Sequence, residues 1–259
     1  MAASARAIPW SRFVAVGDSL TEGIGDPVRG RLRGWAERVA IHLRQLDPHV
    51  RFWNLARRSL TTSEVHAAQL QTALDLEPDL VSVIVGMNDA MARSFDVGTF
   101  RDDLVALVAP LNESGATIIM GTLPRDVPLS RLMPTAARVA VRRNLNAVSD
   151  TVIEIASELG AVCVDAPEGW RYTMAECSID GCHPNARGHA HIAELTLEAL
   201  ARRAQLTIPS IDRDQTAWLP SSLGHLRWLA SQGYLQVPTI IARLRRRDPG
   251  AARRTKNST

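Results

Sequence analysis

Short apolar runs alternate with longer amphipathic stretches from the N-terminus to about residue 203. The apolar runs are rich in β-branched side chains, which is typical of strands covered on both faces. They predict strands at residues 13–16, 50–55, 80–85, 116–120 and 161–164. The stretches between them repeat apolar residues at helical spacing and predict helices at residues 36–46, 63–74, 100–111, 136–159 and 186–203.

This alternation predicts an α/β fold, a three-layer α/β/α sandwich with a five-stranded parallel sheet of the flavodoxin-like type. We expect residues 11–204 to form this domain. Residues 205–244 do not continue the alternation and predict a C-terminal helical extension, and residues 245–259 predict a basic, disordered tail. Ligands of such sheets bind beyond the carboxyl ends of the strands, so we expect the catalytic or binding residues there.

Composition and cysteine usage narrow the class of protein. Hydrophobic residues make up 46% and charged residues 22% of the 259 residues, which excludes a largely disordered chain. No apolar run approaches the roughly 18 residues of a membrane span, and residues 1–12 lack the apolar stretch of a secretory signal. Cys163, Cys177 and Cys182 have no CxxC spacing, which favours separate thiols over a Cys177–Cys182 pair. These features predict a cytoplasmic protein in a reducing compartment.

The basic residues are uneven in kind and in place. Lys256 is the only lysine among 30 basic residues, which excludes Schiff-base and phosphate-binding lysine chemistry within the fold. Residues 242–259 hold seven basic residues against Asp248, a net charge of +6, whereas the whole chain carries +3. Residues 1–241 therefore carry −3, and no nucleic-acid partner is predicted from the body of the protein.

Side chains for a serine acyl-transfer site follow the predicted strands. Ser19 comes directly after the first strand and supplies a hydroxyl that needs a base to become a good nucleophile. His183, in the loop before the last helix, is the candidate base, and Asp180 is placed to orient its ring and stabilise the imidazolium. Asn88, after the third strand, offers an amide N–H to a developing oxyanion.

Three blocks in this order resemble the GDSL, or SGNH, hydrolases over roughly residues 12–203. They are Gly17-Asp18-Ser19-Leu20, Gly86-Met87-Asn88-Asp89 and Asp180-Gly181-Cys182-His183-Pro184. The resemblance implies a cofactor-free serine hydrolase that cleaves acyl esters through an acyl-enzyme. It implies Ser19 as nucleophile, His183 as base, Asp180 as orienting acid and Asn88 as oxyanion donor. Gly17, Asp18 and Gly86 are expected to support the site.

The second block departs from the family pattern. The family has a glycine five residues after the asparagine that corresponds to Asn54, and its backbone N–H completes the oxyanion hole together with that of Ser19. This chain has Ser59 there. Either Ser59 adopts the glycine's backbone conformation at some cost and keeps the donor, or the loop is remodelled and the donor is lost.

Several of these residues also have a structural interpretation. Ser19 alone is as consistent with a helix cap, but together with Asn88 and His183 it favours catalysis. Asp89 is expected to brace its loop, and Cys182 occupies a variable position of its block. His189 and His191 lie two residues apart on a predicted helix and share no face, so no metal site is predicted.

The acyl donor and the role of the tail are left open. The same fold serves thioesterases, lysophospholipases and glycan O-deacetylases, and a non-catalytic binding protein is an alternative from another class. The helical extension either packs on the catalytic domain or anchors it on a membrane, and the basic tail is either simply solvated or contacts an anionic membrane, an acidic partner or RNA.

Overall fold

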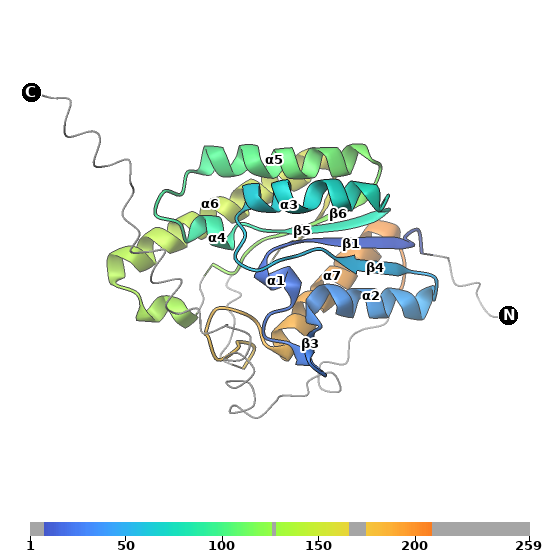
Figure 1. Ribbon diagram of the computed structural model, residues 1–259, viewed down its shortest axis with the longest axis horizontal. Coiled ribbons are helices and arrows are strands. Elements are labelled where there is room, and N and C mark those ends of the chain that lie inside the picture. The colour runs from blue at the N-terminus through green and yellow to red at the C-terminus, as the bar shows by residue number, and fades with distance from the viewer. Residues whose placement is uncertain (1–7, 126–127, 166–174, 209–259) are drawn as a thin grey trace, which may run out of the picture.

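The computed structural model describes residues 8–125, 128–165 and 175–208, and a parallel five-stranded sheet lies at its centre (Figure 1). The strands are β1 (Arg12–Gly17), β4 (Arg51–Asn54), β5 (Leu80–Ile84), β6 (Thr117–Gly121) and β7 (Val162–Val164). Their spatial order is β4-β1-β5-β6-β7, and every pairing is parallel. This order confirms the predicted flavodoxin-like sheet.

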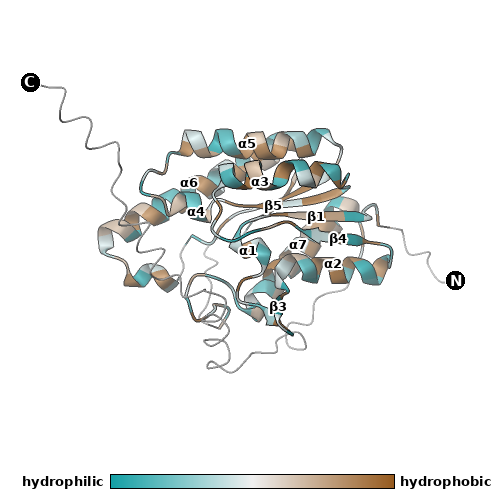
Figure 2. Cartoon of the chain, viewed as in Figure 1, coloured by the Kyte–Doolittle hydropathy of each residue, from teal (hydrophilic) through white to brown (hydrophobic). Residues whose placement is uncertain are grey.

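Helices cover both faces of the sheet (Figure 1). One layer contains α3 (Thr62–Asp75), α5 (Val97–Glu113) and α6 (Thr135–Leu159), and the other contains α2 (Gly34–Leu46) and α7 (Ala186–Ala204). Figure 2 shows the strands as largely hydrophobic and the helices as mixed, as expected of strands that are buried between two layers. Every residue of β5 is buried, and burying each large apolar side chain contributes about 1.5–3 kcal/mol.

The register of β1 and β5 brings two of the sequence blocks to one edge of the sheet. Gly17 pairs with Ile84, so the chain leaves both strands at the same level and continues into Ser19 on one side and Asn88 on the other. Gln69 of α3 fixes the end of β1, because its amide accepts from the N–H and donates to the carbonyl of Gly17, both at 2.9 Å. A side chain at position 17 would meet the Ile84 carbonyl oxygen at 2.7 Å, which explains the glycine there.

The structure adds short elements that the sequence pattern did not predict. Two are single-turn helices at the sheet edge, α1 (Ser19–Glu22) and α4 (Met87–Ala90). The others are the two-residue strands β2 (Pro27–Val28) and β3 (Arg31–Leu32), which pair antiparallel, and the 3-10 helix η1 (Pro128–Leu132). These elements are too short to produce a hydrophobic period.

The predicted C-terminal parts lie almost entirely outside the described residues. Of the extension at 205–244 the structure describes only residues 205–208, and the tail at 245–259 is not described. Within the described ranges, no helix is both long enough and apolar enough to cross a membrane.

Candidate active site

Ser19, His183 and Asp180 form a chain of hydrogen bonds at the carboxyl edge of the sheet. The Ser19 Oγ lies 2.9 Å from His183 Nε2, and His183 Nδ1 lies 2.6 Å from Asp180 Oδ2. The three residues are separated by up to 164 positions in sequence. The structure therefore brings the predicted nucleophile, base and orienting acid together.

The position of Ser19 follows from the turn between β1 and α1. Asp18 caps α1, since its side chain accepts a hydrogen bond from the Leu20 N–H. Ser19 is the first residue of that helix, so the cap is its neighbour rather than Ser19 itself. Gly23 ends the helix in the left-handed conformation, with its N–H on the Ser19 carbonyl. Ser19 is thus fixed at the first position of a single-turn helix that is capped at both ends.

The loop that carries the base is fixed by its own backbone. Asp180 Oδ1 accepts from the N–H groups of Cys182 and His183, at 2.9 and 3.0 Å. The Ser178 N–H donates to the His183 carbonyl at 2.8 Å. Both oxygens of Asp180 are therefore engaged with this loop, which orients the carboxylate toward the imidazole.

Opposing effects act on the two ionisable partners. Burial is the largest single effect and lowers the pKa of His183, but the charge and hydrogen bond of Asp180, together with the charges of Asp18 and Glu22, raise it above its ordinary value. Burial raises the pKa of Asp180, but the histidine and the backbone N–H groups lower it below its ordinary value. Asp180 is therefore a carboxylate at neutral pH and accepts from Nδ1–H. This leaves Nε2 of the neutral ring to accept from the Ser19 hydroxyl.

Asn88 lies beside this chain with its amide directed at two acceptors. Its Nδ2 donates to Asp18 Oδ2 at 3.2 Å and to the Leu60 carbonyl at 2.9 Å. Gly86 precedes it with a φ of 109°, and a side chain there would meet Val148 at 2.7 Å. Gly86 thus provides a sharp entry into α4 that aims Asn88 at α1 and the Asp18 side chain.

Asp18 is a buried acid that contacts both α1 and the Asn88 side chain. It is 2% exposed, and burial raises its pKa to about 6, although the Leu20 N–H opposes the shift. Its two oxygens accept from Leu20 and Asn88. Asp18 therefore orients Asn88 in addition to capping the helix of Ser19.

Ser59 takes the left-handed conformation, with a φ of 66°. This is the first of the two alternatives, in which a serine adopts a backbone conformation that favours glycine. Arg58 immediately before it is clamped to α1, because Glu22 accepts from its N–H at 2.7 Å and from its Nε at 3.0 Å. This ion pair fixes the loop between β4 and α3 next to α1.

Residues outside the chain of hydrogen bonds support the loops around it. Asp89, which was expected to brace its loop, does so by accepting from the Thr62 N–H and hydroxyl at the start of α3. Gln69, Glu22 and Arg58 were missed. Their side chains act on backbone groups or loops far away in sequence, and neither spacing nor residue type indicates such contacts.

The other candidates for chemistry in this region are the Cys182 thiol and two histidines of α7, His189 and His191. Burial raises the pKa of the Cys182 thiol, so it is protonated and a poor nucleophile at neutral pH. His191 contacts the Glu176 carboxylate, whereas His189 contacts the Ile24 carbonyl oxygen. Within the described ranges, no group of three or more His, Cys, Asp or Glu side chains is arranged to hold a metal ion.

The chain matches one protein family over most of its length. The model of a family described as the GDSL-like lipase/acylhydrolase family matches residues 15–191, more than half of the chain. No curated protein matches the chain.

Solved structures share the fold at low sequence identity. A lipase/acylhydrolase from Enterococcus faecalis is 19% identical with a TM-score of 0.61, and the match covers 78% of this chain and 100% of that chain. LAE5, an alpha/beta hydrolase enzyme from the metagenome of Lake Arreo, is 21% identical with a TM-score of 0.60 and coverage of 76% and 97%. Axe2, an acetylxylan esterase from Geobacillus stearothermophilus, is 18% identical with a TM-score of 0.58 and coverage of 73% and 94%.

Proposed function

Because the chain belongs to the GDSL-like lipase/acylhydrolase family of ester-hydrolysing enzymes, we propose that it cleaves carboxylic acyl esters with Ser19 as its nucleophile. The observation that carries this proposal is the hydrogen-bonded chain from Ser19 Oγ through the His183 ring to Asp180. A serine hydroxyl needs a base within hydrogen-bond reach, and a base needs an orienting partner on its other nitrogen. A purely binding protein needs neither.

The proposed reaction has two halves. Ser19 Oγ attacks the ester carbonyl carbon while His183 Nε2 takes the hydroxyl proton, and Asp180 stabilises the imidazolium through Nδ1–H. The tetrahedral intermediate collapses, the alcohol leaves with the proton from Nε2, and Ser19 carries the acyl group. His183 then takes a proton from water, the hydroxide attacks the acyl carbon, and the acid is released as Ser19 regains its proton.

We propose that the oxyanion is held by the backbone N–H groups of Ser19 and Ser59 and by the amide of Asn88. Both hydrogens of Asn88 have acceptors in the resting structure, so one must move to the oxyanion. The bond to Asp18, at 3.2 Å, is longer than the bond to the Leu60 carbonyl. We therefore assign the exchange to the Asp18 side, and losing this donor typically raises the barrier by about 2.7–4 kcal/mol.

The test is hydrolysis of p-nitrophenyl esters from acetate to decanoate by the wild type and by Ser19→Ala. We expect the variant to lose at least about 10⁴-fold in kcat, since nucleophile and base act as a unit. Its thermal unfolding should match that of the wild type, and a fluorophosphonate should label the wild type alone. A folded Ser19→Ala protein with unchanged turnover would contradict the proposal.

The same preparation distinguishes the acyl substrates. The chain-length profile measures the length of the acyl group that the site accepts. A panel with an acyl thioester, a lysophospholipid and acetylated xylan distinguishes thioesterase, lysophospholipase and glycan O-deacetylase activity. Labelling of Ser19 without turnover on any of them would indicate a specialised ester. No labelling and no turnover would favour the binding protein.

A further inference from the structure

His189 lies four residues into α7 and is fully buried, yet the proposed reaction does not use it. Its Nε2 lies 2.8 Å from the Ile24 carbonyl oxygen, and its Nδ1 receives the Trp35 N–H at 3.2 Å. A carbonyl only accepts and a backbone N–H only donates, so the ring must be neutral with its proton on Nε2. Burial also lowers its pKa to about 4, which keeps the ring neutral near pH 7.

The carbonyl that His189 contacts belongs to the segment of the nucleophile. The Ile24 N–H donates to the Ser19 carbonyl at 3.2 Å, next to the Gly23 N–H that ends α1. The Ile24 residue is therefore tied to Ser19 by its N–H and to His189 by its carbonyl.

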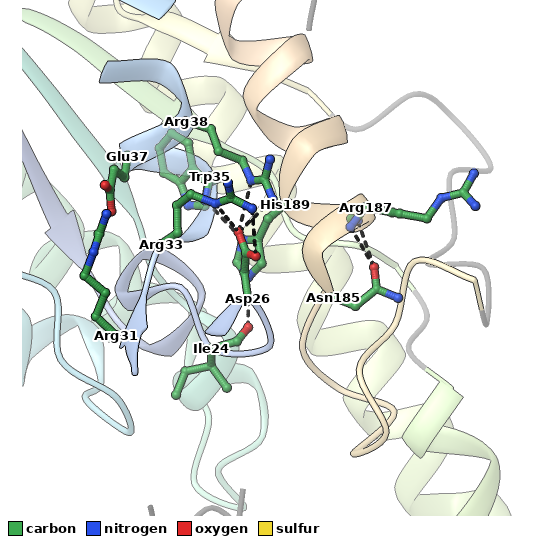
Figure 3. A network of polar contacts seen from close by, with 11 residues as sticks. Ile24, Asp26, Arg31, Arg33, Trp35, Glu37, Arg38, Asn185, Arg187 and His189 are labelled. Carbon is green, nitrogen blue, oxygen red and sulfur yellow. Dashed lines mark hydrogen bonds and ion pairs between the residues drawn. The ribbon is translucent and has the colours of Figure 1, made fainter. Parts of the chain in front are cut away.

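The helix that carries His189 begins three residues after His183. Asn185, two residues after His183, caps α7 by accepting from the Arg187 N–H at 2.9 Å (Figure 3). Its amide donates to the Cys177 carbonyl at 3.0 Å. The His189 N–H donates to the Asn185 carbonyl at 2.9 Å. Hydrogen bonds therefore join the start of α7 to the loop that carries His183.

The two segments also touch through their backbones. A Cβ at Gly25 would lie 1.9 Å from the Pro184 carbonyl oxygen, so only glycine allows this approach. Pro184 follows His183 directly, and Gly25 follows Ile24. The contact closes a ring of interactions that runs from Ser19 through Ile24 and His189 back to His183.

A buried charge cluster anchors the nucleophile's side of this ring. Figure 3 shows the guanidinium groups of Arg33 and Arg38 directed at Asp26, with His189 beside them. Arg38 Nε lies 3.0 Å and Arg33 Nε 3.2 Å from Asp26 Oδ2, and Asp26 is 1% exposed. Asp26 favours protonation of His189, and Arg38 opposes it. The cluster holds the segment after α1 against α2 and leaves the Ile24 carbonyl aimed at His189.

We propose that His189 is a positioning residue that sets the Ser19–His183 distance through the Ile24 carbonyl. It touches no reacting atom and acts through the backbone of the nucleophile's segment. The inference rests on the proposed function, because it concerns the same serine and histidine.

Two amide variants separate the two hydrogen bonds of the ring. His189→Gln places an Nε2 donor near the position of the histidine Nε2 and keeps the bond to Ile24. His189→Asn ends near the position of Nδ1 and reaches only the Trp35 N–H. We expect kcat with p-nitrophenyl acetate to fall by about 10–100-fold in His189→Asn, since a misplacement of about 1 Å costs about 10²-fold. His189→Gln should stay within about threefold, and KM should change little in either.

His191→Asn is the matched control, because this residue lies on the same helix and contacts Glu176 instead. It should keep the wild-type kcat. All variants are compared well below their melting temperatures. Equal losses in His189→Asn and His189→Gln, or a wild-type kcat in His189→Asn, would overturn the inference.

A readout without substrate separates this inference from the proposed function. Side-chain ¹⁵N NMR of the wild type should show His189 as the neutral Nε2–H tautomer without titration between about pH 5 and 8. The low-field proton on His183 Nδ1 should persist in His189→Gln and broaden or shift in His189→Asn. An Nδ1–H tautomer at His189 would overturn the inference even in a protein that hydrolyses esters. If Ser19→Ala hydrolyses esters as the wild type does, the proposed function fails while these spectra still test the positioning.

Discussion

Burial and the Asp180 carboxylate act in opposite directions on the pKa of His183. Burial lowers its pKa, and Asp180 raises it to above the ordinary value of about 6.5. A general base must be neutral, so activity is lost as the pH falls through this raised pKa. We predict that the acid limb of kcat/KM for p-nitrophenyl acetate has its midpoint above pH 6.5.

Asp180→Asn tests the cause of the shift. Without the carboxylate the burial effect remains, so the acid limb should move to lower pH. The amide also fails to fix the tautomer, and kcat should fall on the order of 10³–10⁴-fold. Rates of the wild type and of Asp180→Asn, measured over about pH 5–8, check both predictions. A wild-type midpoint at or below 6.5, or equal midpoints in the two proteins, would contradict this account.

Residue type and order were enough to predict the hydrogen-bonded chain. Ser19, Asn88 and His183 each follow a strand of a parallel sheet, whose carboxyl ends meet at one edge. The supporting contacts could not be predicted in this way. Gln69 acts on the backbone of Gly17, 52 residues earlier, and nothing in its helical position indicates that partner.

The loop between β4 and α3 is the element that departs from the family. Arg58 is clamped to Glu22 on α1, and the next residue, Ser59, has a φ of 66°. A left-handed conformation costs a non-glycine residue about 1–2 kcal/mol. We predict that Ser59→Gly relieves this strain, which is offset by about 0.5–1 kcal/mol of added chain entropy in the unfolded state. The variant should therefore be as stable as the wild type or slightly more stable.

The same variant tests the proposed donor. Glycine keeps the backbone N–H, so kcat with p-nitrophenyl acetate should stay within about threefold of the wild type. Arg29, at the β2–β3 turn with a φ of 50°, is the matched position, and Arg29→Gly should show the same stability effect. Urea unfolding and initial rates measure the two quantities. A tenfold loss of kcat in Ser59→Gly would mean that the hydroxyl, rather than the N–H, serves the site.

At the scale of the molecule, the hydrophobic pattern was sufficient to predict the sheet. The five apolar runs are long enough to be recognised, and β5 is buried along its whole length. The ring through His189 could not be predicted, because Ile24 lies 165 residues away and a buried histidine on a helix indicates no partner. Short-range patterns therefore predicted the frame of the site, and long-range polar contacts complete it.

The basic tail, residues 245–259, differs in net charge from the rest of the chain. Residues 245–259 contain six basic residues and Asp248, which give a net charge of +5. The whole chain carries +3, so residues 1–244 carry −2. The five strands of the parallel sheet and the proposed nucleophile, base and oxyanion donors lie before residue 209. We therefore predict that a chain ending at residue 244 keeps kcat/KM for p-nitrophenyl acetate within about twofold, since the charge of the tail does not steer an uncharged ester.

Sedimentation with phosphatidylserine vesicles is measured on the same two proteins. Binding confined to the full chain, with equal kcat/KM, would assign membrane contact to the tail and hydrolysis to the α/β domain. No binding by either protein would leave the tail as solvated charge. A loss of hydrolysis greater than about tenfold on truncation would contradict the prediction. The catalytic unit would then extend beyond the α/β sandwich, and the tail would act on the site rather than only on the protein's net charge.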